Sequence, residues 1–368
     1  MKSMRTFGFI GLGLIGGSIA KAIHLKYPDT HIMAYTRTRR TSEEALSSGV
    51  IQEICSSASD PRFSSCDMIF LCAPVGTNTA AMAELRQVIS PETLLTDVGS
   101  VKTEIHRVAE ANGLSAQFIG GHPMAGSEKS GFSSANEHLF ENAWYILTPS
   151  PQADPTWTQA YRELVSGFGA LPLQLSCEEH DYITAAVSHL PHMIASSLVN
   201  TVHNLDSREE HMKLIAAGGF KDITRIASSS PEMWEQICIH NHENISKVMD
   251  EFIRLLTEAR DHMNSGDGSH IYKMFESSGN YRNSFSSAPL GMIKKTYRIY
   301  CDIIDESGAI ATIATILSVS GINIKNIGIV HNREFEEGVL RIEFYESEPA
   351  KKAAAVLRQH HYQVWERS

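Results

Sequence analysis

Three glycines at a fixed spacing follow an apolar run near the start of the chain. Residues 6–10 read as a β-strand, and Gly11 and Gly13 follow it. Gly16 lies in the first turn of the next segment, residues 15–25, which reads as a helix. Gly11 would allow a tight turn, Gly13 the close approach of a phosphate group to the backbone, and Gly16 close packing of the helix on the strand. A strand, a glycine turn and a helix in this order are typical of a dinucleotide-binding βαβ unit.

The helix that follows such a turn would hold a pyrophosphate with its N-terminal N–H groups and its dipole. The residues expected to surround the dinucleotide here are Gly11, Leu12, Gly13, Leu14, Ile15 and Gly16.

The end of the second expected strand indicates which nucleotide is bound. Position 36 is Thr36, Arg37, Arg39 and Arg40 follow, and no carboxylate occurs before Glu43. A carboxylate would bind a ribose 2′-hydroxyl, whereas a hydroxyl and arginines suit a 2′-phosphate. The sequence therefore favours NADP over NAD, with Thr36, Arg37 and Arg39 as contacts. The alternative is that these arginines only form a solvated loop.

Short β-rich runs alternate with amphipathic stretches up to about residue 176, so we expect parallel strands joined by crossover helices in an α/β, doubly wound, Rossmann-type domain over residues 1–176. After the first strand the expected strands are 31–36, 68–73, 94–98, 118–120, 144–148 and 171–175, and the further helices are 41–48, 77–89 and 101–111.

From residue 177 the strand signals fade, and an all-helical domain is expected over 177–277. Its helices are predicted at 179–205, 208–217, 221–226 and 231–263, the last beginning with Pro231. A stretch rich in Ser, Gly and Asn then predicts a linker over 278–295.

The last segment, 296–368, reads as a small domain of its own. Strands are predicted at 297–304, 322–331, 338–345 and 362–365, with helices at 309–318 and 350–359. This βαββαβ order is that of a ferredoxin-like fold.

Charge and hydropathy exclude some classes of protein. The 368 residues carry a formal net charge of −10 without a broad basic face, so nucleic-acid binding is not expected. No apolar stretch reaches 18 residues, so no membrane span is expected, and the glycine-rich N-terminal segment is taken as part of the mature protein. Six cysteines without a CxxC pair suggest reduced thiols and a cytoplasmic protein.

Four polar motifs carry the candidate chemistry. Residues 97–102 (Asp-Val-Gly-Ser-Val-Lys) and 120–128 (Gly-Gly-His-Pro-Met-Ala-Gly-Ser-Glu) each follow an expected strand, which would bring Ser100 and His122 to the carboxyl edge of the sheet. Residues 188–192 (Ser-His-Leu-Pro-His) and 218–227 (Gly-Gly-Phe-Lys-Asp-Ile-Thr-Arg-Ile-Ala) lie in the helical region.

With the glycine loop, these motifs resemble those of the prephenate dehydrogenase family, in the same order and over residues 6 to about 265. The resemblance implies oxidative decarboxylation of prephenate to 4-hydroxyphenylpyruvate, with hydride transfer to NAD or NADP, in tyrosine biosynthesis. It implies that His122 takes the proton of the substrate hydroxyl and that Ser100 hydrogen-bonds this histidine or the hydroxyl. Arg225 would bind a substrate carboxylate through its planar guanidinium.

The resemblance implies further contacts. Substrate contacts would be His192, His189, Glu128, Lys129 and Trp234, and further cofactor contacts Ala73, Pro74, Val75, Gly99 and Ser100. His189 and His192 would share one helix face only if the helix continues across Pro191. A homodimer is expected from the family alone.

Other readings stay open at this point. An arogenate dehydrogenase would share the fold, and no residue separates the two substrates. A nonenzymatic amino-acid sensor would keep the nucleotide-binding fold, but Ser100, His122 and Arg225 argue against it. A β-hydroxyacid dehydrogenase would share the first two domains, but it would be expected to use a lysine on its central helix and has no need of the loop at residues 122–128. His240 and His242 point away from each other on a helix, so no metal site is expected.

Residues 296–368 resemble an ACT domain, a module that binds amino acids. The resemblance implies an effector site with Asp305, Gly308 and Asn323, and L-tyrosine as its ligand. The alternative is a module that only pairs subunits.

Overall fold

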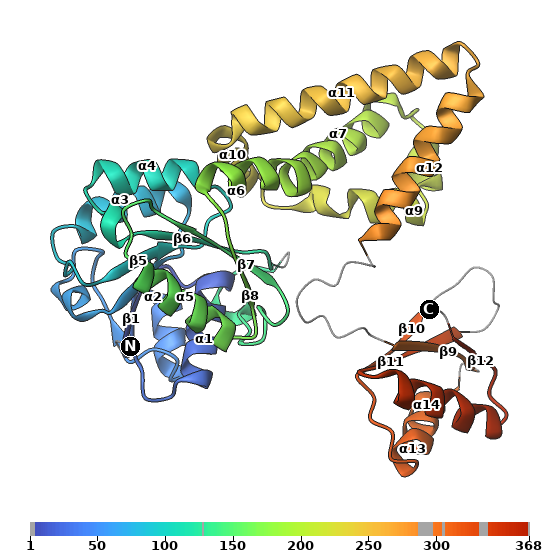
Figure 1. Cartoon of the computed structure of the whole chain (residues 1–368), viewed down its shortest axis with the longest axis horizontal. Helices are drawn as coiled ribbons and strands as arrows, with labels where there is room; N and C mark the ends of the chain where they lie inside the picture. Colours follow the sequence, from blue (N-terminus) through green and yellow to red (C-terminus); the bar gives the residue numbers. More distant parts are fainter. Residues whose placement is uncertain (1–3, 127–128, 286–296, 304–305, 331–337, 367–368) are drawn as a thin grey trace. The chain divides into compact units, whose positions relative to one another are not determined.

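The computed structural model describes residues 4–126, 129–285, 297–303, 306–330 and 338–366 in two compact units (Figure 1). Met1–Arg282 form the first unit and Asn283–Ser368 the second, and each is described by itself. The predicted contacts Glu128 and Asp305, and the linker from residue 286 to 295, lie outside the described residues.

A parallel sheet forms the centre of the first unit. Its strand order is β3-β2-β1-β4-β5, with β1 (Thr6–Ile10), β2 (His31–Tyr35), β3 (Glu53–Ile54), β4 (Met68–Leu71) and β5 (Leu94–Asp97). This order confirms the doubly wound prediction and puts the reversal of the winding between β1 and β4, where such sheets bind ligands. The two-residue edge strand β3 was not predicted.

Helices cover both faces of this sheet because successive strand residues point to opposite sides. Phe7 and Phe9 pack in one apolar cluster with residues of α1 (Leu14–Lys26), α2 (Arg39–Ser47) and α5 (Pro155–Gly167). Ile10, Ile69 and Leu71 pack in a second cluster with residues of α3 (Val75–Leu85) and α4 (Thr103–Ala111). The sequence analysis did not single out α5.

A second sheet continues beyond β5 and corrects the prediction of uniformly parallel strands. It contains β6 (Ile119–Pro123), β7 (Trp144–Pro149) and β8 (Leu171–Gln174), and β6 pairs antiparallel with β7, whereas β7 and β8 are parallel. In the described residues between β6 and β7 there is only a short 3-10 turn, Phe132–Ser134, and no crossover helix. Without such a helix the next strand returns antiparallel.

The helical part of the first unit begins with one long helical run. It consists of α6 (Cys177–Thr184), a π-turn (Ala185–His189) and α7 (Leu190–Leu205). Shorter helices follow, α8 (His211–Ile215) and α9 (Gly218–Thr224), and then α10 (Pro231–His240), α11 (His242–Asn264) and α12 (Gly268–Ser284). Among the helices of the described ranges, none is both long and apolar enough to cross a membrane.

Two helix predictions are wrong in detail. The predicted helix 231–263 is divided at Asn241, whose side chain amide binds the carbonyl oxygen of Asp181 at 2.8 Å. The predicted linker, which begins at residue 278, is helical as far as Ser284. Its apolar residues Ile271, Met274 and Phe275 follow helical spacing, which outweighs the low helix propensity of the serines and glycine beside them.

The second unit confirms the βαββαβ prediction. Its elements are β9 (Tyr297–Ile303), α13 (Ala309–Val319), β10 (Asn326–Val330), β11 (Gly338–Phe344), α14 (Ser347–Gln359) and β12 (Val364–Glu366). The sheet order is β10-β11-β9-β12 with antiparallel neighbours, and apolar residues of both helices fill its core. The second strand starts at Asn326, so the expectation that Ile322 to Ile324 belong to it is wrong.

Candidate active site

The glycine turn after β1 has the geometry expected of a phosphate-binding loop. Gly11 has a φ of +96°, which favours glycine, and a Cβ on Gly16 would lie 2.6 Å from the Gly11 carbonyl oxygen. A Cβ on Gly13 would meet nothing within 4 Å, and no side chain caps the N-terminus of α1 that follows it. The first N–H groups of α1 therefore border open space, an arrangement that suits the binding of phosphate groups.

The side chains after β2 make hydrogen bonds and ion pairs within the protein that the sequence did not indicate. The hydroxyl of Thr36 donates to the Thr38 carbonyl oxygen at 2.9 Å, and Arg39 and Arg40 pair with Glu43 and Glu44 across one exposed helical turn. Arg37 is exposed and forms no ion pair within the described ranges. Arg37 is thus the arginine of this group that is available to a ligand.

The predicted contacts at the ends of β4 and β5 are held by local hydrogen bonds. Ala73 donates its N–H to the Asn78 side chain at 3.1 Å, and Val75, directly after Pro74, donates its own to Gln236 on α10 at 3.2 Å. Gly99 donates its N–H to Asp97 at 2.8 Å. The Gln236 bond links the first turn of α3 to the helical part of the same unit.

His122 lies on β6 and is almost fully buried. Its Nδ1 is 2.8 Å from Nε2 of His180, and Nδ1 of His180 is 2.8 Å from Oδ1 of Asp181. Burial, together with His180, Lys102 and His189, holds the pKa of His122 far below its usual range, so the ring is neutral near pH 7. We call these three residues the His122 chain.

Lys102 contacts the His122 chain through its backbone N–H, which donates to Oδ1 of Asp181 at 2.7 Å. Its Nζ pairs with Asp97 and donates to the Gly121 carbonyl oxygen at 2.8 Å, and its side chain is fully buried. Ser100, in the turn between Asp97 and Lys102, makes no hydrogen bond with His122 among the described residues. The hydrogen bond that the structure describes for the His122 ring is the one with His180.

The helical run containing His189 and His192 continues across Pro191, as the shared-face interpretation required. Pro191 lies in the first turn of α7, directly after the π-turn, where the missing N–H is tolerated. Both rings pack on Trp234 of α10, His192 stacked at 3.8 Å between centroids and His189 edge-on at 5.9 Å. Asn241 also lies 3.1 Å from Nδ1 of His189.

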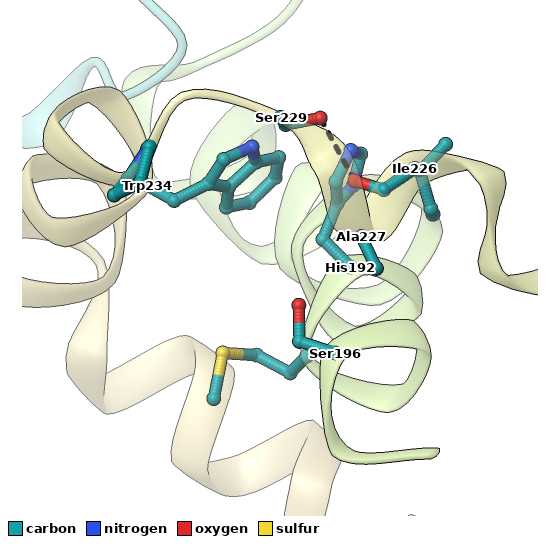
Figure 2. Close-up of a pocket in the computed structure, with 8 residues that line it drawn as sticks. His192, Ser196, Ile226, Ala227, Ser229 and Trp234 are labelled. Atoms are coloured by element: carbon teal, nitrogen blue, oxygen red, sulfur yellow. Dashed lines mark hydrogen bonds between the residues drawn. The ribbon is translucent and has the colours of Figure 1, made fainter. Parts of the chain in front are cut away.

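A cavity of about 190 Å³ opens beside Trp234 (Figure 2). Figure 2 shows the Trp234 indole turned toward α7, which contributes His192 and Ser196, with Ile226 and Ala227 on the turn after α9. The volume is smaller than that of a typical drug-sized pocket, so the cavity suits a small ligand or one part of it. His122 does not line it; the two are connected through the His122 chain, Asn241 and His189.

Arg225 begins the turn Arg225–Ser228 that carries Ile226 and Ala227, and it is exposed. Burial lowers the pKa of His192, and the positive charge of Arg225 adds to this effect. Lys129 is exposed in the loop after β6. In the second unit Gly308 has a φ of +95° at the start of α13, and Asn323 is exposed.

One cluster of potential metal ligands escaped the sequence analysis. Ligand atoms of His262, Asp267 and His270 lie within 4.8 Å of one another, and the two imidazoles stack at 3.5 Å where α11 meets α12. In a protein the rings of ligating histidines present their lone pairs in the ring plane, so two parallel rings would have to rotate to share one ion.

Sequence reasoning missed His180, Asp181 and Asn241. His180 and Asp181 lie in residues 177–181, which look like an ordinary helix start with acidic residues in the first turn. The signal that was available is the adjacent His-Asp pair, because a carboxylate that accepts from one ring nitrogen of a histidine fixes which nitrogen carries the proton.

Comparison with known proteins agrees with these motifs. Two family models match, "Prephenate dehydrogenase, nucleotide-binding domain" over residues 19–172 and "Prephenate dehydrogenase, dimerization domain" over residues 176–277. A prephenate dehydrogenase of Bacillus subtilis is 39% identical over 345 residues, 93% of each chain.

Solved structures agree as well. Prephenate dehydrogenase from Aquifex aeolicus, in complex with hydroxyphenyl propionate and NAD+, has a TM-score of 0.73 at 31% identity and covers 77% of this chain and 99% of its own. Synechocystis arogenate dehydrogenase has a TM-score of 0.69 at 26% identity and covers 76% and 99%. The chain belongs to the prephenate dehydrogenase family.

Proposed function

We propose that the protein is an NAD(P)-dependent oxidoreductase that converts prephenate to 4-hydroxyphenylpyruvate and CO2. The observation that carries the proposal is the buried, neutral His122 on β6, next to Gly121, whose N–H donates to Asp97 at the end of β5. The B. subtilis relative, which is a prephenate dehydrogenase and matches over nearly the whole chain, supports it.

The residues supply the proton chemistry and the binding. A bound nicotinamide would accept the hydride that leaves C4 of the substrate, and the hydroxyl on that carbon must lose its proton. His122 accepts this proton as a neutral imidazole, a contribution of about 10² to 10⁴ in rate. Loss of CO2 makes the ring aromatic, and the proton returns to the resulting phenolate oxygen, so the step needs no other reactant.

Substrate binding is assigned to the cavity beside Trp234 and the groups around it. His192 stacks on Trp234, and Arg225 begins the turn that carries the lining residues Ile226 and Ala227. The guanidinium of Arg225 can bind a carboxylate in a bidentate manner. His189, Lys129, Glu128 and Ser100 complete the proposed contacts. The hydroxyphenyl propionate in the Aquifex structure has the aromatic ring and carboxylate that such groups would bind.

NADP is proposed as the preferred cofactor. No carboxylate stands at the end of β2, and Arg37 is available to a 2′-phosphate, whereas Arg39 already pairs with Glu43. The Aquifex neighbour holds NAD+, so the two nucleotides have to be compared directly.

A steady-state assay crossing prephenate and arogenate with NADP and NAD tests these assignments. We expect the highest kcat/KM with prephenate and NADP. Higher kcat/KM with arogenate would make the protein an arogenate dehydrogenase, as its Synechocystis neighbour is. Absence of turnover with every pair would favour a nonenzymatic sensor and end the proposal.

The second unit is proposed to be an ACT domain that binds L-tyrosine near Asp305, Gly308 and Asn323. Its βαββαβ sheet and the glycine with φ +95° at the start of α13 support this role. Added tyrosine should lower kcat and raise the melting temperature. If neither changes, the unit has a different ligand or only pairs subunits.

A homodimer in the cytoplasm completes the proposed setting. The match to a dimerization domain supports the dimer, and six free cysteines, several with a pKa raised by burial, support a reducing compartment.

A further inference from the structure

We propose that His180 and Asp181 act as positioning residues that fix the tautomer of His122, with the proton on Nδ1 and the accepting lone pair on Nε2. The inference rests on the proposed function, because it specifies which nitrogen of the assigned base receives the substrate proton.

The direction of each hydrogen bond follows from the end of the His122 chain. An ionised carboxylate only accepts, so Nδ1 of His180 donates to Oδ1 of Asp181 over 2.8 Å. A neutral His180 then has its lone pair on Nε2. Nδ1 of His122, 2.8 Å away, must donate to that lone pair, which leaves Nε2 of His122 without a proton.

Asp181 is itself held as a carboxylate by the start of α4. Its Oδ1 accepts the backbone N–H of Lys102 at 2.7 Å, and its Oδ2 accepts that of Thr103 at 2.8 Å. Three donors and the positive end of the helix dipole favour the charged form. Despite burial, which alone would raise it, the pKa of Asp181 is lower than usual.

The groups around the His122 chain keep both rings neutral. Burial lowers the pKa of His180 more than its bond to Asp181 raises it. The Lys102 ammonium, which pairs with Asp97, opposes a further positive charge on either ring. His189 faces His122 from the π-turn and burial lowers its pKa to about 4, so it too is neutral. A neutral His180 can accept from His122 but not donate to it while Nδ1 serves Asp181.

The chemical consequence resembles the role of the aspartate in a serine-protease triad. There the carboxylate holds the base in the productive tautomer, and changing it to asparagine lowers kcat about 10⁴-fold while the geometry is kept. Here the carboxylate acts through a second imidazole. If the hydrogen bonds of the His122 chain ran in the opposite direction, the proton of His122 would lie on Nε2. That nitrogen would then have no lone pair to accept the substrate proton.

Three variants test the proposal by kinetics. Asp181→Asn should lower kcat by about 10² to 10⁴-fold with KM changed less than about threefold, because chemistry and not binding is affected. His180→Phe removes the acceptor of the Nδ1 proton and should cause a similar loss. His180→Gln keeps an acceptor oxygen and should retain at least about ten times the kcat of His180→Phe.

A matched control separates positioning from stability. His106→Gln removes another half-buried imidazole, which bonds the Thr148 hydroxyl at 3.0 Å and makes no bond to the His122 chain. It should lower the melting temperature and leave kcat within about twofold. Equal kcat in His180→Phe and His180→Gln, or a loss seen only in KM, would overturn the proposal.

A direct measurement does not depend on turnover or on the stability of a variant. Nitrogen-15 NMR of the imidazoles in the wild-type protein should show His122 protonated at Nδ1 and unprotonated at Nε2 at pH 7. A protonated Nε2 would refute the tautomer assignment. Failure of the proposed function would instead appear as no wild-type turnover, whatever tautomer the spectrum shows.

Discussion

A single imidazole on β6 has to satisfy two opposing demands. Burial lowers the pKa of His122, which guarantees a free lone pair at neutral pH but makes the nitrogen a weaker base. In the proposed reaction this weakness is acceptable, because aromatisation supplies the driving force and the base needs only to be positioned and unprotonated. The bonds through His180 to Asp181 meet that need with buried residues alone.

At the residue scale, the first prediction concerns His122. His122→Asn keeps a side chain that hydrogen-bonds but cannot take a proton, so kcat should fall by about 10² to 10⁴-fold. The affinity for NADP, measured by fluorescence titration without substrate, should change less than about threefold because the glycine loop is untouched. A variant with near-normal kcat would show that His122 is not the base.

Arg225 carries the second prediction. Arg225→Ala removes the proposed carboxylate contact and should raise KM for prephenate at least about tenfold, with a smaller change in kcat. Arg225→Lys should recover only part of the affinity, since an ammonium lacks the planar fork of the guanidinium. The exposed Arg208→Ala in the same helical region serves as the control and should leave KM unchanged. An unchanged KM in Arg225→Ala would remove this residue from the substrate site.

Two buried histidines make stability depend on pH. Burial lowers the pKa of both His106 and His189 to about 4 from an ordinary value near 6.5. Below pH 6.5 the unfolded chain takes up protons that the folded protein refuses, so this contribution is full above pH 6.5 and declines as the pH falls toward 4. The free energy of unfolding, from urea titrations, should therefore decrease over this range.

The variant His106→Gln tests whether His106 contributes to the pH dependence of the unfolding free energy. Its unfolding free energy should be below that of the wild type above pH 6.5, and the difference should narrow as the pH approaches 4. A difference that stays constant across the range would mean that His106 does not titrate with folding.

At the scale of elements, the glycine loop separates packing from binding. A Cβ on Gly16 would lie 2.6 Å from the Gly11 carbonyl oxygen and 2.7 Å from the Cβ of Cys72, so Gly16→Ala should destabilise the protein by about 1 to 3 kcal/mol or more. Gly13→Ala meets nothing within 4 Å and should fold normally, but its methyl group occupies the space proposed for the pyrophosphate. Gly16→Ala should therefore lower the melting temperature, whereas Gly13→Ala should lower the affinity for NADP and leave the melting temperature unchanged. If Gly13→Ala binds NADP normally, the loop is not the phosphate site.

Some elements of the fold and the site could be predicted from local sequence patterns, and others could not. Local patterns identified β1, the glycine turn and α1, because the turn requires glycine at defined positions and the flanking periodicities are strong. Patterns could not identify the antiparallel pairing of β6 with β7, which depends on the lack of a crossover helix in the described residues between them. The bond of His180 to His122, 58 positions earlier, is a tertiary contact without a local sequence signal. Likewise, the break at Asn241 follows from its bonds to Asp181 and His189.

At the scale of the whole molecule, the helical part exposes more apolar surface than a monomer needs. Leu214 and Ile215 on α8 are 78% and 76% exposed, and Phe275 and Tyr281 on α12 are 68% and 70% exposed. Exposed apolar side chains of this size are unfavourable in water, and burial between two copies would recover about 25 cal/mol for each Å² removed. The match of residues 176–277 to a dimerization domain also supports a dimer contact in this part of the chain.

The last prediction follows from that surface. Sedimentation equilibrium should give a mass of twice 40.7 kDa for the wild-type chain. Introducing charges with Leu214→Glu and Ile215→Glu should shift the equilibrium toward monomer, because burying an unpaired carboxylate in an interface is costly. The exposed Leu25→Glu, on α1 of the Rossmann part, makes the same chemical change away from the helical region and should leave the mass unchanged. If the double variant stays dimeric while Phe275→Glu dissociates, the contact lies along α12 rather than α8; a monomeric wild type would mean that the apolar helices serve another purpose.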